Sequence, residues 1–236
     1  MTHYLTYFET AVKTFWNNLA LSNYGKEDFT FGQVAEQIER NHILLELAGA
    51  QRGDKVVLCA RNSAQWAMAF MSVTSFDAVV VPVLNDFPPE SVQKLTAHSD
   101  ATVIFTEPGI WEKMDAEAMP NLKAAFNMLS GKALMLRDSE LTAEAIKAKV
   151  EEEFKKRFPN GMKPENVSYP TGSLDELEII NYTSGKTSAP KGFMLSALNF
   201  ISNIEFGRNR IPAYEGETML SMLPMAHLYG MAFEFV

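Results

Sequence analysis

Three short, continuously apolar runs separated by helical segments constrain the fold of this chain more than any other feature. The runs cover residues 56–59, 79–83 and 102–105 and are rich in β-branched side chains. Continuous hydrophobicity, in place of alternation, is typical of strands that are covered on both faces. The segments between them, 63–76 and 89–98, are predicted as helices. Alternating strands and helices imply right-handed crossovers, so we expect an open α/β fold with a mostly parallel sheet and helices on both faces.

Further elements are expected on either side of this core. Tyr7, Phe8, Val12, Phe15 and Leu19 have helical spacing and predict an N-terminal helix over about residues 6–18. Residues 29–31 are predicted as a brief strand, followed by a helix that ends at Gly49. Later in the chain we expect a helix around Trp111 and Met114, a strand over 124–128, a helix from 143 to 158 with one apolar stripe, and an exposed connector over 160–173.

The run Tyr-Thr-Ser-Gly-Lys-Thr-Ser-Ala-Pro-Lys-Gly, residues 182–192, is the clearest candidate for chemistry. It follows an apolar strand candidate over 177–181 and precedes a helical pattern that starts near Ala197, with Ser196 as N-cap. Glycine lets a backbone curl close to phosphate oxygens, while hydroxyls and lysines donate hydrogen bonds and charge. An ordinary polar surface turn would use the same vocabulary. A Walker A loop is excluded because Ile180 occupies the position of its first glycine.

The same run resembles the phosphate-binding signature of the adenylate-forming enzymes, whose usual form is Y-T-S-G-T-T-G-x-P-K-G. Eight positions match, and the departures are Lys186 and Ser188. Residues 223–230, Leu-Pro-Met-Ala-His-Leu-Tyr-Gly, resemble the family's L-P-x-x-H-x-x-G segment. Upstream, the segments around 29–31, 53–56 and 62–66 are similar to fatty acyl-CoA ligases.

This resemblance implies a long-chain fatty acid–CoA ligase that uses ATP, Mg²⁺ and coenzyme A and acts on small-molecule substrates. It implies phosphate binding by residues of the signature loop, with Thr183 or its neighbour Ser184 near the metal ion and Thr183 our choice as ligand. The binding residues would be Thr183, Ser184, Gly185, Lys186, Thr187, Ser188, Lys191 and Gly192. An acyl-AMP ligase, an activator of another acid, or a non-catalytic nucleotide-binding module with a degenerate loop remains open.

His227 is the candidate catalytic residue. A lone histidine among apolar residues is more often packed in a core, but its place in the motif implies that it lies where carboxylate and thiol meet. A strand over 218–223 is expected to end just before it, and the methionines around it suit either an acyl pocket or core packing. His3, His42 and His98 have no such context and are expected to be structural or on the surface.

Composition limits the partners and the compartment. The net charge of −8, without a basic stripe, argues against nucleic acid as a partner. Cys59 is the only cysteine, which excludes an internal disulfide and favours a reducing cytoplasm, with a buried thiol in the strand. We find no secretory signal and no apolar run of membrane-spanning length, and peripheral membrane association of a full-length protein stays open.

The chain divides into residues 1–50, a βαβ unit over 51–175, and the loop and histidine segments over 176–236. Family members continue beyond the position of Val236, with adenine- and ribose-binding segments and a small domain that carries the adenylation lysine. We therefore expect a partial N-terminal domain with little or no activity alone. Ser188 would cost about 1–2 kcal/mol if the glycine it replaces is left-handed in relatives.

Overall fold

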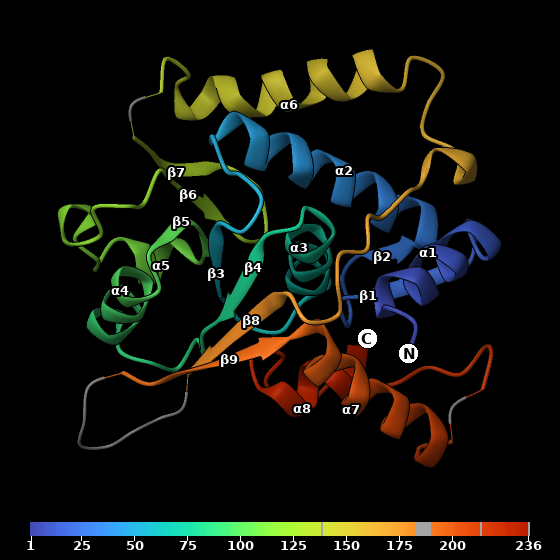
Figure 1. Ribbon diagram of the computed structural model, residues 1–236. Helices are drawn as coiled ribbons and strands as arrows, with labels where there is room; N and C mark the ends of the chain where they lie inside the picture. The colour runs from blue at the N-terminus through green and yellow to red at the C-terminus, as the bar shows by residue number, and fades with distance from the viewer. Residues whose placement is uncertain (138, 183–189, 213, 236) are drawn as a thin grey trace.

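A computed structural model shows a seven-stranded sheet flanked by helices, with a separate two-stranded hairpin (Figure 1). The structure describes residues 1–137, 139–182, 190–212 and 214–235. The strand order in the large sheet is β7-β6-β5-β3-β4-β8-β9. These strands are β3 (Lys55–Cys59), β4 (Val79–Pro82), β5 (Ala101–Thr106), β6 (Ala124–Asn127), β7 (Ala133–Leu136), β8 (Leu177–Tyr182) and β9 (Gly192–Ser196). The five central strands are parallel and the two edge strands are antiparallel, which confirms the mostly parallel sheet.

Both faces of the sheet are buried, as the continuous apolar runs predict. On β3, Val56 and Leu58 belong to one core, while Val57 and Cys59 belong to the other. The first core lies under α1 (Tyr4–Thr14), α2 (Phe31–Leu47), α3 (Ala64–Ser75), α6 (Ala143–Arg157) and α7 (Ala197–Arg210). The second lies under α4 (Pro89–His98) and α5 (Pro108–Trp111), on the opposite side in Figure 1. Two covered faces explain why these strands do not alternate polar and apolar residues.

Local sequence signals set the helix boundaries. Ser63 accepts a hydrogen bond from Trp66 N and starts α3, while Thr30 and Ser196 form capping boxes at α2 and α7. Gly49 follows the end of α2 with φ +71°, a conformation that glycine adopts without strain. The expected helices over 63–76, 89–98 and 143–158 are therefore confirmed to within one or two residues.

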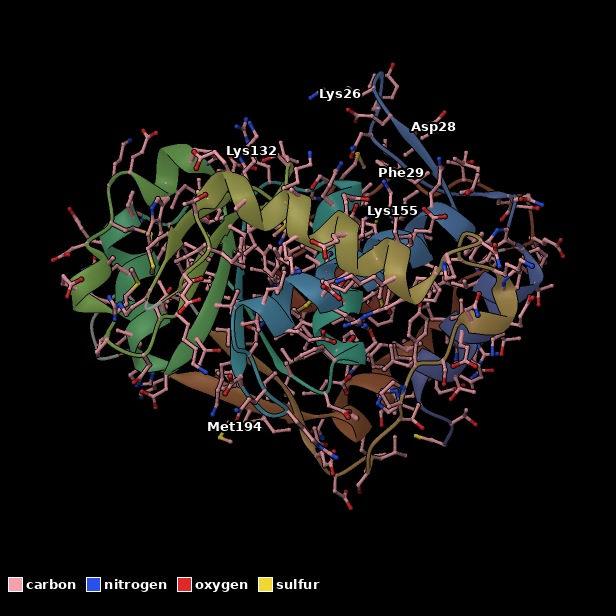
Figure 2. The ribbon with its side chains drawn as sticks, turned by 90° about the horizontal axis from the view of Figure 1, so that it is seen from above. Lys26, Asp28, Phe29, Lys132, Lys155 and Met194 are labelled. Atoms are coloured by element: carbon pink, nitrogen blue, oxygen red, sulfur yellow. The ribbon has the colours of Figure 1, made fainter. Side chains whose placement is uncertain are left out.

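The N-terminal helix is shorter than the sequence predicts, because α1 ends at Thr14. Leu19, which the helical spacing placed on that helix, instead begins β1 (Leu19–Ser22). This strand pairs antiparallel with β2 (Asp28–Thr30), and Phe31 already belongs to α2 because Thr30 is its N-cap. Figure 2 shows Lys26 at the tip of this projecting hairpin and Asp28 at the start of its second strand.

The strand expected over 218–223 does not form. Residues 217–222 have no regular structure, and Met219, Leu220 and Met222 are exposed. A strand needs a neighbour that pairs with its backbone, and in the described part of the chain no strand pairs with this segment. It leads through a turn to α8 (Leu228–Gly230) and a π-helical stretch over Met231–Phe235.

The remaining differences concern short elements. The antiparallel edge strand β7 was not expected, and 3-10 turns occur at Ala116–Ala118 and Pro164–Asn166. The connector over 160–173 is not fully exposed, because Val167 and Tyr169 are buried against the larger core. Within the described ranges, no helix has the length and hydrophobicity required to cross a bilayer.

Candidate functional site

The hairpin of β8 and β9 holds the two ends of the candidate phosphate loop together. Tyr182 and Gly192 are paired across the two strands at the point where the loop leaves and returns. Six of the predicted binding residues lie outside the described residues, so their roles stay predictions. They are Thr183, Ser184, Gly185, Lys186, Thr187 and Ser188. Of the predicted phosphate-binding residues, Lys191 and Gly192 are described, and both are exposed.

Gly192 lies against the side chains of β8. A Cβ atom at this position would lie 2.8 Å from Cγ2 of Ile180 and 3.2 Å from the ring of Tyr182. These separations are shorter than ordinary van der Waals contacts, so a side chain would have to displace one neighbour. The last glycine of the signature therefore has a packing reason that does not depend on any ligand.

His98 binds the tyrosine that precedes the loop. Its Nδ1 atom lies 2.7 Å from the Tyr182 hydroxyl, and the two rings make an edge contact with centroids 5.7 Å apart. Burial raises the pKa of the Tyr182 hydroxyl, and the nearby charge of Asp100 raises it further. His98 is the last residue of α4 and is 84 positions from Tyr182 in sequence. The sequence gives no local sign of this contact, and His98 was expected to have only a default structural or surface role.

Because β3, β4, β5 and β8 run parallel, their carboxyl ends lie together at one edge of the sheet. Arg61 and Glu107, which follow β3 and β5, form a two-point ion pair there with distances of 3.1 and 3.0 Å. The hydrogen bond from Arg61 lowers the pKa of the Glu107 carboxyl. Lys191 makes no ion pair within the described ranges. In open α/β sheets this edge is where ligands bind.

Asn62 attaches the histidine segment to this same edge. Its Nδ2 donates to the carbonyl of Leu223 at 2.6 Å, and its Oδ1 accepts from Met225 N at 2.9 Å. Glu234 adds a second anchor, because its carboxylate accepts from Leu223 N at 3.2 Å. Asn62 follows β3 closely, so His227 reaches the same edge as the loop without the strand that was expected to deliver it.

His227 is exposed, so it is not a packed core histidine. It is the N-cap of α8, where Nδ1 accepts from Tyr229 N at 3.3 Å. In a neutral ring, an accepting Nδ1 leaves the proton on Nε2. Of the methionines near it, Met225 and Met231 are buried while Met219 and Met222 are exposed.

Two other sequence expectations can be compared with the structure. Cys59 is fully buried, which confirms the expected buried thiol in the strand, and this burial raises the pKa of the thiol to about 12. Among the residues that the structure describes, no group of three or more His, Cys, Asp or Glu side chains could hold a metal ion. The predicted ligand for Mg²⁺, the Thr183 hydroxyl, is outside these residues.

A mostly parallel sheet with helices on both faces defines an open α/β domain, the class of fold in which ligands bind at the carboxyl ends of the strands. The sequence model of the family described as AMP-binding enzyme matches residues 8–236. The chain therefore belongs to the AMP-binding enzyme family, which confirms the resemblance carried by the two motifs.

Curated relatives include several acid ligases. The chain is 29% identical over 211 residues to the long-chain-fatty-acid–CoA ligase FadD15 of Mycobacterium tuberculosis, covering 87% of this chain and 33% of the relative. It is 25% identical over 229 residues to the oxalate–CoA ligase of Arabidopsis thaliana, covering 94% of this chain and 40% of that protein. The chain thus spans about a third of the length of the curated relatives it matches first.

Solved structures with the same fold include the anthranilate CoA ligase AuaEII in complex with anthranoyl-AMP. That structure has a TM-score of 0.77 at 16% identity and covers 98% of this chain and 42% of its own. The N-terminal domain of FACL13 from Mycobacterium tuberculosis has a TM-score of 0.75 at 18% identity, covering 98% of this chain and 54% of its own. At these identities the likeness concerns the fold alone.

Proposed function

We propose that this chain forms the phosphate-binding part of a long-chain fatty acid–CoA ligase. The observation that carries the proposal is that the two ends of the β8–β9 loop and the His227 segment lie at one edge of the sheet. Membership of the AMP-binding enzyme family supports the reaction class, and relatives named as long-chain-fatty-acid–CoA ligases support the acid. The acid and its acceptor remain part of the proposal, because one relative is named for oxalate and another for an acyl-carrier-protein acceptor.

The reaction would proceed in two displacements. A carboxylate oxygen attacks the α-phosphorus of ATP, the bond to the bridging oxygen breaks, and pyrophosphate leaves. The sulfur of coenzyme A then attacks the acyl carbon, and AMP leaves. Negative charge develops on the departing pyrophosphate, so donors and cations placed around it lower the barrier. Lys191 and the hydroxyls of residues 183–188 would fill this role, and Mg²⁺ bound through Thr183 would add charge neutralisation.

His227 would orient the substrate by donating a hydrogen bond. The neutral ring with its proton on Nε2 has a donor available there, while Nδ1 is occupied by Tyr229 N. A donor at this position can bind a carboxylate or an acyl oxygen, which helps to align the attacking atoms. Asn62 would support this role from outside the reacting groups, since it fixes the backbone two residues before the histidine.

Calorimetric titration of the 236-residue chain with Mg-ATP tests the proposal. Lys191→Met should weaken binding by roughly tenfold, because a hydrogen-bonding cation is lost from the phosphates. Lys132→Met is the matched control, since Lys132 is also exposed but lies in the β6–β7 turn (Figure 2). Equal affinities of the two variants would contradict the proposed role of the loop.

Catalysis by the chain alone is a separate question. Pyrophosphate exchange into ATP in the presence of a fatty acid is expected to be weak or undetectable with residues 1–236. The reason is that the chain spans about a third of the length of the curated relatives it matches first, and the segments that bind adenine and ribose and the adenylation lysine are expected outside that third. Robust exchange by the chain would show that this expectation is wrong.

A further inference from the structure

A cavity of about 400 Å³ lies on the face of the sheet that α1, α2, α3 and α7 cover, apart from the candidate phosphate site. Five elements line it, namely α1, β1, α2, α3 and α7. None of its lining residues comes from β8, β9 or the segment over 218–235. A ligand in this cavity would therefore bind apart from the residues to which the ligase function is assigned.

The walls of the cavity are mainly apolar. Phe8, Met68, Met71 and Ile204 are among the side chains that line it, and both methionines are buried. Flexible thioethers adapt to ligands of irregular shape. An apolar cavity of about 150 Å³ holds one benzene ring, so by proportion about 400 Å³ has room for roughly 10 to 16 carbon atoms. This volume also lies within the range of about 300–1,000 Å³ that is common for small-molecule sites.

One side of the cavity carries a cation. The Arg208 guanidinium lies over the Tyr7 ring, with Cζ 4.3 Å from the ring centroid, and the Arg208 side chain is 54% exposed. Nη1 of Arg208 and the Tyr7 hydroxyl both donate to the same oxygen of Glu205, at 3.1 and 2.8 Å. A guanidinium has five N–H donors in a planar fork, so one carboxylate oxygen leaves donors for a second anion.

We propose that this cavity binds an alkyl carboxylate of about 10 to 16 carbons, with its alkyl chain between α1 and α3 and its carboxylate at Arg208. Burying the alkyl chain of the ligand removes apolar surface from water, and the Arg208 cation at the rim favours a negatively charged head group. Tyr4 also lines the cavity, but its hydroxyl donates to Glu178 and does not serve as the anchor.

Nuclear magnetic resonance of the chain with labelled methionine methyl groups tests this site. Titration with decanoate should shift the signals of Met68 and Met71 to saturation, while Met119 in the other core stays in place. Each signal is assigned by a methionine-to-leucine substitution. Decyltrimethylammonium, which has the same chain and a cationic head, should bind more weakly. Unmoved Met68 and Met71 signals, or stronger binding of the cation, would overturn the proposal.

Two substitutions separate the anchor from the apolar chamber. Arg208→Gln should lower the affinity for decanoate by at least about threefold and leave that for the neutral 1-decanol unchanged. Ala11→Phe, on the wall contributed by α1, should fill the chamber and abolish binding of both ligands. Unchanged decanoate affinity in either variant would contradict the site. A shift confined to Met225 would also contradict it, because decanoate would then bind beside His227.

Discussion

Replacing Gly192 with alanine is expected to destabilise the chain by about 1 kcal/mol, although a glycine-to-alanine change usually stabilises. Loss of unfolded-state entropy would favour the alanine variant by about 0.4–1 kcal/mol. Against this, the new methyl would lie 2.8 Å from Cγ2 of Ile180 and 3.2 Å from the Tyr182 ring. The Ile180 methyl is on a branched Cβ with a restricted χ1 angle, and the Tyr182 ring is held by His98. Overpacking of this kind costs about 1–3 kcal/mol, so the loss outweighs the gain.

Thermal and urea unfolding of the variants, followed by circular dichroism, measure this difference. Gly109→Ala is the matched control, because a methyl there would meet no atom within 4 Å and should be neutral or slightly stabilising. For a chain of this size, 1 kcal/mol corresponds to roughly 2–4 °C in Tm. The Gly192 variant should therefore melt below wild type and the control at or above it. A Gly192 variant as stable as the control would refute the packing argument.

Three further predictions follow from particular contacts. Asn62→Ala should speed hydrogen exchange at the Met225 amide by about fivefold or more, because that amide loses the Asn62 Oδ1 acceptor, while overall stability falls by about 1 kcal/mol at most. Unchanged exchange would show that Asn62 does not anchor the segment. The pKa of the Glu107 carboxyl is lowered by Arg61, so the stability from this pair is present above the unfolded pKa and lost as pH falls through the folded pKa. The urea midpoint of Glu107→Gln should therefore fall less with acidification than that of the wild type. An equal fall in both proteins would be evidence against this role of the pair. Cys59 should resist iodoacetamide at pH 8 in the folded chain and react in urea, since burial raises its pKa to about 12; rapid labelling of the folded chain would contradict this.

The parts of the fold that could be predicted are those encoded by local periodicity. The runs over 56–59 and 79–83 are apolar at every position because both faces of their strands are covered, and this can be recognised without tertiary information. The helix starts at Ser63 and Ser196 could be recognised from capping residues for the same reason. The segment over 218–223 has the composition of a strand, but composition does not say whether a neighbouring strand is present to pair with it.

The candidate site was predictable only where it coincides with a motif. His227 and the loop ends were found in this way, whereas His98 and Glu234 were not, because their contacts join residues that no short pattern connects. Asn62 was noted within an upstream likeness, yet its amide contacts with the backbone at Leu223 and Met225 depend on the folded chain. Side-chain contacts to distant backbone leave almost no trace in a single sequence.

The antiparallel hairpin of β8 and β9 has a consequence for the order in which the site assembles. Tyr182 pairs with Gly192, so the ends of the loop meet after only 192 − 182 = 10 residues. The parallel neighbour of β8 is far away in sequence, since Val80 pairs with Ile179 and 179 − 80 = 99. Closing a loop of about ten residues takes on the order of 10–100 ns, and hairpins form in about 1–10 μs, whereas pairing over long separations is slower. The ends of the candidate phosphate loop can therefore be joined by local pairing alone, before β8 pairs with β4.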